Sequence, residues 1–215
     1  MSGEAQLEAF LIGLLAGVGG TAAGAFLGQV GGRRAYAWMR FFLSLAAGVM
    51  IGIVVVDLLP AAMRLLDRPR LYLWTGVGMI GVALLEAAQT HGRWQTDGGK
   101  RPAARAEADS LIVAAAVALH NVPEGLAIGS SLAHAHTTGV AVAALLALHN
   151  VPEGLAVGLP AAHSGAGVRR AVWAGLPTAL GAWLGRVWFV QPHALGVSLA
   201  FAAGAMLEVT LGVLL

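Results

Sequence analysis

One segment rich in metal-ligating residue types occurs twice in this sequence. Residues 118–129 read ALHNVPEGLAIG and residues 147–158 read ALHNVPEGLAVG, so the two copies differ at a single position. Each copy places a glutamate four residues after a histidine, giving the pairs His120 with Glu124 and His149 with Glu153. Side chains four residues apart share one face of an α-helix, so each pair can converge on one ion. The repeat therefore predicts a site with two imidazole and two carboxylate ligands.

The composition predicts that lipid, rather than water, surrounds the elements that hold this repeat. Hydrophobic residues make up 58% of the 215 residues and charged residues 11%, whereas soluble domains are roughly a quarter charged. A membrane helix needs about 20 apolar residues in succession. Seven runs meet this need, and they do not alternate as barrel strands would: 7–29, 41–60, 71–89, 111–133, 139–162, 171–190 and 194–215. The predicted fold is an all-α, polytopic transmembrane helix bundle of seven helices.

The offset between the two copies places them on consecutive membrane helices. From Ala118 to Ala147 the offset is 29 residues, which is one crossing and a short turn. Consecutive helices run in opposite directions, so the two motifs lie at the same depth, related by a pseudo-twofold axis in the membrane plane. Such inverted repeats are typical of transporters, whose binding sites lie near the midplane.

The four ionisable residues have two interpretations. In the first they only pair with one another and join two helices. In the second they bind a metal ion, which neutralises both carboxylates while neutral imidazoles complete its coordination. Ionisable groups cost about 2.5–3.5 kcal/mol each at the centre of a membrane helix, which favours the second interpretation. Asn121 and Asn150 lie about 100° around the helix from each histidine and are further candidate ligands through their amide oxygens.

Charge and cysteine content narrow the function further. A formal net charge of +2 is too small to indicate a nucleic-acid partner, and the absence of cysteine excludes thiolate ligands and disulfides.

Basic residues set the orientation of the chain in the membrane, because cytoplasmic loops carry the excess of lysine and arginine. One set of loops holds nine, and the other holds Arg64, Arg68, Arg70 and Arg186. The N-terminus is therefore expected outside, and the C-terminus inside if there are seven helices.

The HNVPEG motif resembles the signature of the ZIP (Zrt/Irt-like) metal transporter family, prokaryotic type, whose fourth and fifth helices carry a His-Asn-x-Pro-Glu-Gly pattern. GLLAGVGGTAAGAFLG at 13–28 is similar to the first helix of that family, LAAGVMIGIVVVDLLP at 45–60 to its second, and LAFAAGAM at 199–206 to its seventh. The resemblance implies a 3+2+3 arrangement of helices around one metal position. It also implies that His120, Glu124, His149 and Glu153 bind metal, with the Met50 thioether as an additional ligand.

Asp57 has two interpretations of equal weight. It lies seven residues, about two turns, beyond Met50 on the same helix face. The resemblance implies a place near the extracellular entrance of the metal path. Alternatively, it is an interfacial acid at a helix end before Pro60.

Two features depart from the family pattern. Family members typically have eight helices, whereas seven are predicted here, which leaves the first helix without its inverted-repeat partner and indicates a truncated form or a shortened relative. Thr178 stands where many prokaryotic members have a glutamate that bridges a second metal. Glu208, in the last apolar run, is a second candidate accessory residue beside Thr178.

The leading hypothesis is therefore a single transmembrane transporter domain over residues 1–215, with a flexible cytoplasmic loop at 91–110. It would carry divalent ions into the cytoplasm across the plasma membrane, the inner membrane in a bacterium. The ion is the substrate, with zinc first and cadmium, iron(II), manganese or cobalt as alternatives, and no organic cofactor is expected. Lipid and a homodimer partner are the expected contacts. The competing functions are an intramembrane zinc-dependent hydrolase, which would need a separate general base, and a metal-binding membrane protein without flux.

Overall fold

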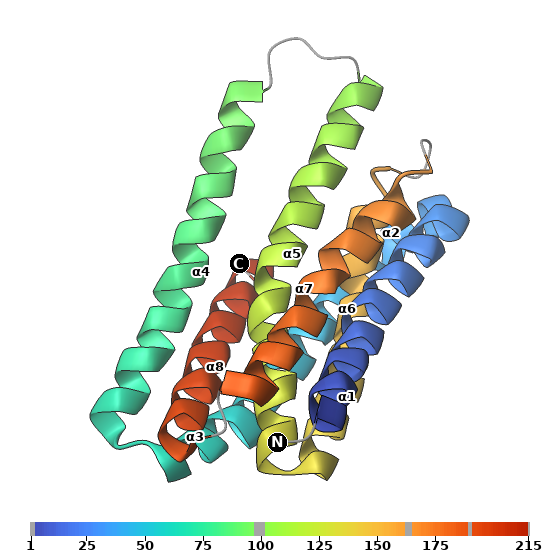
Figure 1. Ribbon diagram of the computed structural model, residues 1–215. Coiled ribbons are helices and arrows are strands. Elements are labelled where there is room, and N and C mark those ends of the chain that lie inside the picture. Colours follow the sequence, from blue (N-terminus) through green and yellow to red (C-terminus); the bar gives the residue numbers. More distant parts are fainter. Residues whose placement is uncertain (1–2, 97–101, 162–164, 189–190, 215) are drawn as a thin grey trace.

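The computed structural model describes residues 3–96, 102–161, 165–188 and 191–214, and within these ranges the chain is helical with short turns and no strand. This confirms the all-α class. In the described residues the helices make up seven rods, because η1 and η2 continue their neighbouring helices and α2 breaks at Gly32; Figure 1 shows the rods packed side by side. The first joins α1 (Gly3–Leu14), the π-helical turn η1 (Leu15–Gly19) and the start of α2 (Gly20–Ile53); the second joins the rest of α2, the π-helical turn η2 (Val54–Leu58) and α3 (Leu59–Leu65). The others are α4 (Arg68–Thr96), α5 (Pro102–His134), α6 (His136–Gly158), α7 (Gly167–Trp188) and α8 (Pro192–Leu214).

Gly32 separates the first two rods within α2. Its backbone has φ 49° and ψ −123°, which is outside the helical region although α2 continues on both sides. A positive φ costs glycine little because it has no Cβ, and other residues rarely adopt it. The reversal at Gly32 thus divides α2 into a first half, residues 20–32, and a second half, residues 33–53.

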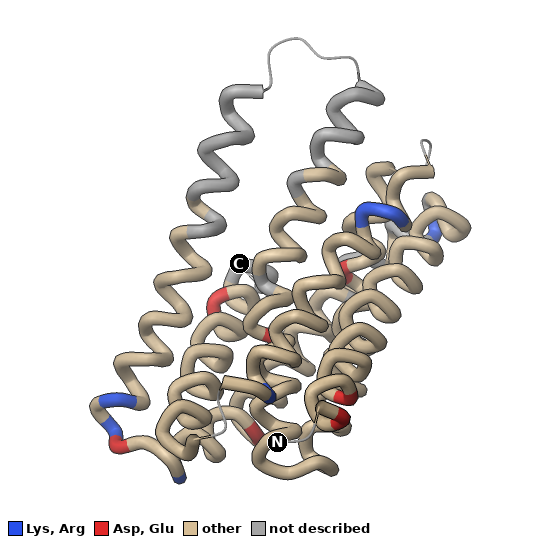
Figure 2. Tube along the Cα trace, in the orientation of Figure 1, with Lys and Arg blue, Asp and Glu red and all other residues tan. Residues whose placement is uncertain are grey.

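Four helical stretches in the described residues are long and apolar enough to cross a membrane. They are Gly3–Gly32, Leu43–Leu65, His136–Gly158 and Pro192–Leu211. Figure 2 shows the positive residues near the two ends of the bundle, with few charges in between. These observations make the chain an integral membrane protein. The other three rods, α4, α5 and α7, coincide with predicted spans. Their described residues do not meet the same limits of length, mean hydropathy and charge.

The connection expected at 91–110 is shorter in the structure. α4 continues to Thr96 and α5 begins at Pro102, so that only residues 97–101, which are outside the described part of the chain, separate them. The reason lies in local propensity. Residues 103–108 read AARAEA, all good helix formers, and proline is favoured in the first turn of a helix.

Close backbone contacts at glycines join neighbouring rods, and we describe the rods as two groups. In the first group a Cβ at Gly24 or Gly154 would overlap backbone of the facing helix, which joins the first half of α2 to α6, and Gly125 and Gly181 join α5 to α7 in the same way. Here we call α1, η1, the first half of α2, α5, α6 and α7 the site group. The second half of α2, η2, α3, α4 and α8 are the flanking group, in which Gly78 and Gly204 join α4 to α8. Small residues permit such approaches between membrane helices.

The packing also corrects the expected partner within the inverted repeat. Gly17 of the first rod lies against Gly175 of α7, and the first half of α2 packs on α6 as α7 packs on α5. The first rod and α7 are therefore counterparts, and the first rod does not lack one. The rod without a described counterpart is α4.

Candidate metal centre

Three of the four predicted ligands meet inside the site group. Glu124 of α5 and His149 and Glu153 of α6 are buried, and each offers a ligand atom within 4.8 Å of the others. His149 Nε2 lies 2.8 Å from Glu153 Oε1 and 3.4 Å from Glu124 Oε1. Two ligand atoms on a tetrahedral zinc ion, with bonds of about 2.0–2.2 Å, would be roughly 3.4 Å apart. The cluster therefore has the dimensions of a site for one small divalent ion.

The remaining predicted ligand of the repeat is His120. His120 belongs to α5, whose backbone is continuous through Pro123, but its side chain lies outside the described residues. α6 is likewise continuous through Pro152, so the His149 and Glu153 pair keeps the helical spacing that the sequence predicted.

A backbone carbonyl of the flanking group fixes the orientation of His149. His149 Nδ1 lies 3.2 Å from the Ala46 carbonyl oxygen, which can only accept, so Nδ1 donates. Nε2 faces Glu124 and forms a hydrogen bond with Glu153 Oε1. In the neutral ring with its proton on Nδ1, Nε2 carries the lone pair that can bind a cation. Metal-binding histidines commonly have their other nitrogen held by a carbonyl in this way. This contact could not be predicted, because it is made by the backbone of Ala46 and an alanine in an apolar run has no distinctive side chain.

The two motif asparagines make equivalent hydrogen bonds. The Asn121 side-chain amide donates to the Ala174 carbonyl at 2.7 Å, and the Asn150 amide donates to the Ala16 carbonyl at 3.2 Å. A carbonyl oxygen can only accept, so the side-chain nitrogens of Asn121 and Asn150, and not their oxygens, face α7 and η1. Both amide oxygens are buried and accept no hydrogen bond from the described residues. Buried acceptors of this kind are usually satisfied, so these oxygens fit the proposed role of supplementary ligands.

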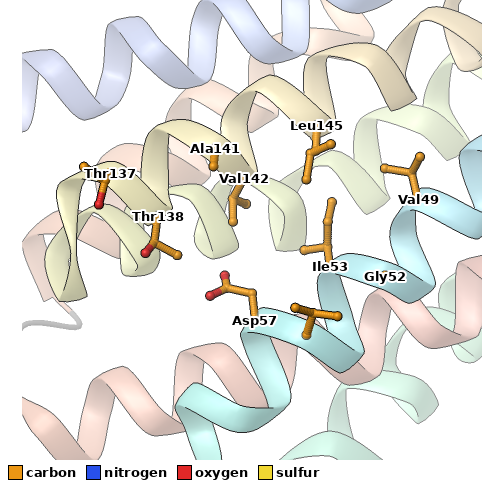
Figure 3. Close-up of a pocket in the computed structure, with 10 residues that line it drawn as sticks. Val49, Gly52, Ile53, Asp57, Thr137, Thr138, Ala141, Val142 and Leu145 are labelled. Carbon is orange, nitrogen blue, oxygen red and sulfur yellow. The ribbon is translucent and has the colours of Figure 1, made fainter.

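Met50 and Asp57 lie on the flanking-group side. Met50 is buried, and its sulfur accepts a hydrogen bond from Thr210 Oγ1 at 3.6 Å. Asp57, in η2, accepts from Ser131 Oγ at 3.3 Å and points into a groove between η2 and α6 (Figure 3). Ser131 follows Glu124 by seven residues on α5, so this contact lies about two turns from the cluster. Neither Thr210 nor Ser131 was foreseen, because a lone hydroxyl in an apolar run has no distinctive spacing.

The two predicted accessory residues lie on α7 and α8. The Thr178 side chain is buried against Gly17, at the contact between α7 and the first rod. Glu208 of α8 is partly exposed and is absent from the described group of convergent ligands. The cluster itself therefore contains two carboxylates, whose charge matches one divalent cation.

Comparison with known families agrees with this geometry. A family model described as ZIP Zinc transporter matches residues 86–215, which include both motifs and more than half of the chain. The chain belongs to the ZIP family. A relative of this ZIP protein, the zinc transporter ZupT of Enterobacter sp. (strain 638), is 30% identical over 122 residues. That match covers 54% of this chain and 47% of the relative, so this ZIP protein is compared with about half of that transporter's length.

Proposed function

We propose that this ZIP protein transports divalent transition-metal ions, zinc foremost, into the cytoplasm. The observation that carries the proposal is the buried cluster of Glu124, His149 and Glu153 on two helices that share an inverted motif. Ionisable groups inside membrane helices are expensive and mark ion pathways. The family membership and the name of the similar zinc transporter support the same activity.

The cluster supplies what a transported ion requires. Glu124 and Glu153 offer two negative charges, and His149 Nε2 offers a nitrogen ligand of intermediate softness, a set that suits zinc and its neighbours. The Asn121 and Asn150 oxygens are the proposed supplementary ligands. Both glutamates face the same imidazole nitrogen, so neither is set apart as the general base that an intramembrane hydrolase would need.

Uptake by proteoliposomes tests the proposal directly. Purified protein reconstituted with an indicator inside the vesicles is expected to admit zinc at a rate well above protein-free vesicles. Competition by cadmium, iron(II), manganese and cobalt would rank the ions. Saturable binding without flux would instead identify a metal-binding membrane protein, and would refute transport.

We expect purified protein to bind one tight equivalent of zinc. Two buried carboxylates neutralise one divalent ion, and a second ion nearby would meet strong repulsion even at an effective dielectric constant of about 20. Isothermal titration would measure the stoichiometry. Glu208→Gln is the matched control and should retain one equivalent, because Glu208 lies outside the cluster. Two tight equivalents in the unchanged protein would contradict the one-ion site.

The direction of transport rests on a proposed orientation with the N-terminus outside. A single cysteine at Ala135, in the turn between α5 and α6, should react with an impermeant maleimide added outside intact cells. A cysteine at Gly98, between α4 and α5, should react only after the cells are opened, because its loop carries the basic residues. The opposite pattern would reverse the proposed direction. Reaction of both from one side would contradict the order of the rods.

A further inference from the structure

The sulfur of Met50 lies on the part of α2 that touches the cluster. The Ala46 carbonyl that accepts from His149 Nδ1 is also the helical acceptor of the Met50 amide, because the two residues are four apart within α2. A helical side chain covers the turn on the N-terminal side of its own Cα. The Met50 side chain, which is 1% exposed, therefore covers the turn of α2 that contacts His149.

A hydroxyl group of α8 holds this sulfur. Thr210 is buried, and its Oγ1 lies 3.6 Å from Met50 Sδ and 2.7 Å from the Met206 carbonyl oxygen. The hydroxyl has one proton and can donate it to either acceptor. If the sulfur turns to an ion, the carbonyl remains as an acceptor, so no buried donor loses its partner. The Met50 sulfur can therefore exchange its hydrogen bond for an ion at small cost.

The availability of this sulfur bears on which ion the site prefers. Glu124, His149 and Glu153 offer carboxylate oxygens and an imidazole nitrogen, which suit zinc. A thioether is a soft ligand, and a soft ligand added to this set favours a softer ion such as cadmium. A group that occupies the sulfur therefore shifts the balance of the site toward zinc.

We propose that Thr210 determines part of the ion specificity, because its hydrogen bond to Met50 competes with any ion for the sulfur. The inference rests on the proposed function, since it requires the cluster to bind a divalent ion. Thr210 does not itself reach the ion and is a positioning residue that acts through Met50. Both residues lie in the flanking group, so their contact does not depend on the ligands of the site group.

Thr210→Val tests the proposal, because valine has nearly the shape of threonine and lacks the hydroxyl. Purified protein is titrated with zinc and with cadmium, each against a chelator of known affinity, and the readout is the ratio of the two dissociation constants. We expect the ratio to shift toward cadmium by about threefold or more, which is the size of effect that one hydrogen bond can have. Thr210→Ala, which is smaller, should shift it in the same direction and serves if valine disturbs packing.

Three further variants isolate the hydrogen bond. Thr75→Val is the matched control, since the Thr75 hydroxyl of α4 is also buried but has no hydrogen-bond partner in the described residues; the ratio should not change. Thr210→Ser keeps the hydroxyl and should retain the original ratio. Met50→Leu should shift the ratio toward zinc, and Thr210→Val added to it should have no effect, because the sulfur through which Thr210 acts is gone.

The outcomes separate this inference from the proposed function. If the unchanged protein binds both ions but neither Thr210→Val nor Thr210→Ala shifts the ratio, the role of Thr210 is wrong while the metal site stands. The same conclusion follows if Thr210→Val shifts the ratio equally in the Met50→Leu background. If the unchanged protein binds neither ion, the proposed function is overturned, and this inference with it.

Discussion

Replacement of Glu153 by glutamine is expected to abolish zinc uptake and to weaken zinc binding at least about 100-fold. Glu153 Oε1 lies 2.8 Å from His149 Nε2, and its carboxylate supplies half of the negative charge of the cluster. Glutamine keeps the size of the side chain and removes the charge, so the change tests electrostatics rather than packing. Proteoliposome uptake and titration against a chelator of known affinity would measure the two effects.

Glu124→Gln should have the same effect, because Glu124 holds the other carboxylate at 3.4 Å from His149 Nε2. The matched control is Asp67→Asn, an exposed acid whose partner is Arg70 at the start of α4. It should transport at the unchanged rate. If either glutamate variant took up zinc normally while remaining folded, the cluster would not be the transport site.

Substitution of Gly24 by leucine should prevent the bundle from folding stably, with a loss of more than about 3 kcal/mol. A Cβ at this position would overlap the Val151 carbonyl of α6, which is backbone and cannot move aside. The first half of α2 would separate from the helix that carries His149 and Glu153. Gel filtration in detergent and thermal unfolding followed by circular dichroism would detect the change.

Gly48→Leu is the control for this second prediction, because nothing lies within 4 Å of the added Cβ. The two substitutions are identical in chemistry and lie on the same helix. Leucine is the better helix former, so helix propensity alone would stabilise both variants to the same extent; equal stability of the two would show that the contact at Gly24 contributes nothing. A large difference would locate the stability in the contact between the first half of α2 and α6.

Much of the fold and part of the site could be predicted from the sequence. The apolar runs located the seven rods because the membrane sets both their length and their polarity. The spacing of His149 and Glu153 predicted their common helix face, and the repeat offset brought Glu124 to them from the neighbouring helix. These predictions depend on periodicity, which local sequence carries directly.

Other features depend on contacts between distant segments and could not be predicted in the same way. The Ala46 carbonyl holds His149 from a helix about 100 residues earlier, and its residue type gives no sign of it. The π-helical turn Val54–Leu58 and the packing of Thr178 on Gly17 are set by tertiary contacts as well. The helix in the outer parts of residues 91–110 was not predicted. The glycines and charged residues at the centre of that range favour a loop, and this preference was applied to the whole range.

The arrangement of the helices in a site group and a flanking group has a consequence for motion. All three clustered ligands belong to the site group, whereas Ala46, Met50 and Asp57 belong to the flanking group. Among the described contacts, Ser131 with Asp57, Ser130 with Ser198 and His149 with Ala46 cross between the groups through hydrogen bonds, which can exchange at small cost. The interlocked glycines within the site group, and those between α4 and α8, cannot exchange in that way. For the transport proposed above, we therefore expect the ligands to move with the site group past the flanking group, and we propose Gly32, where α2 passes from one group to the other, as the hinge.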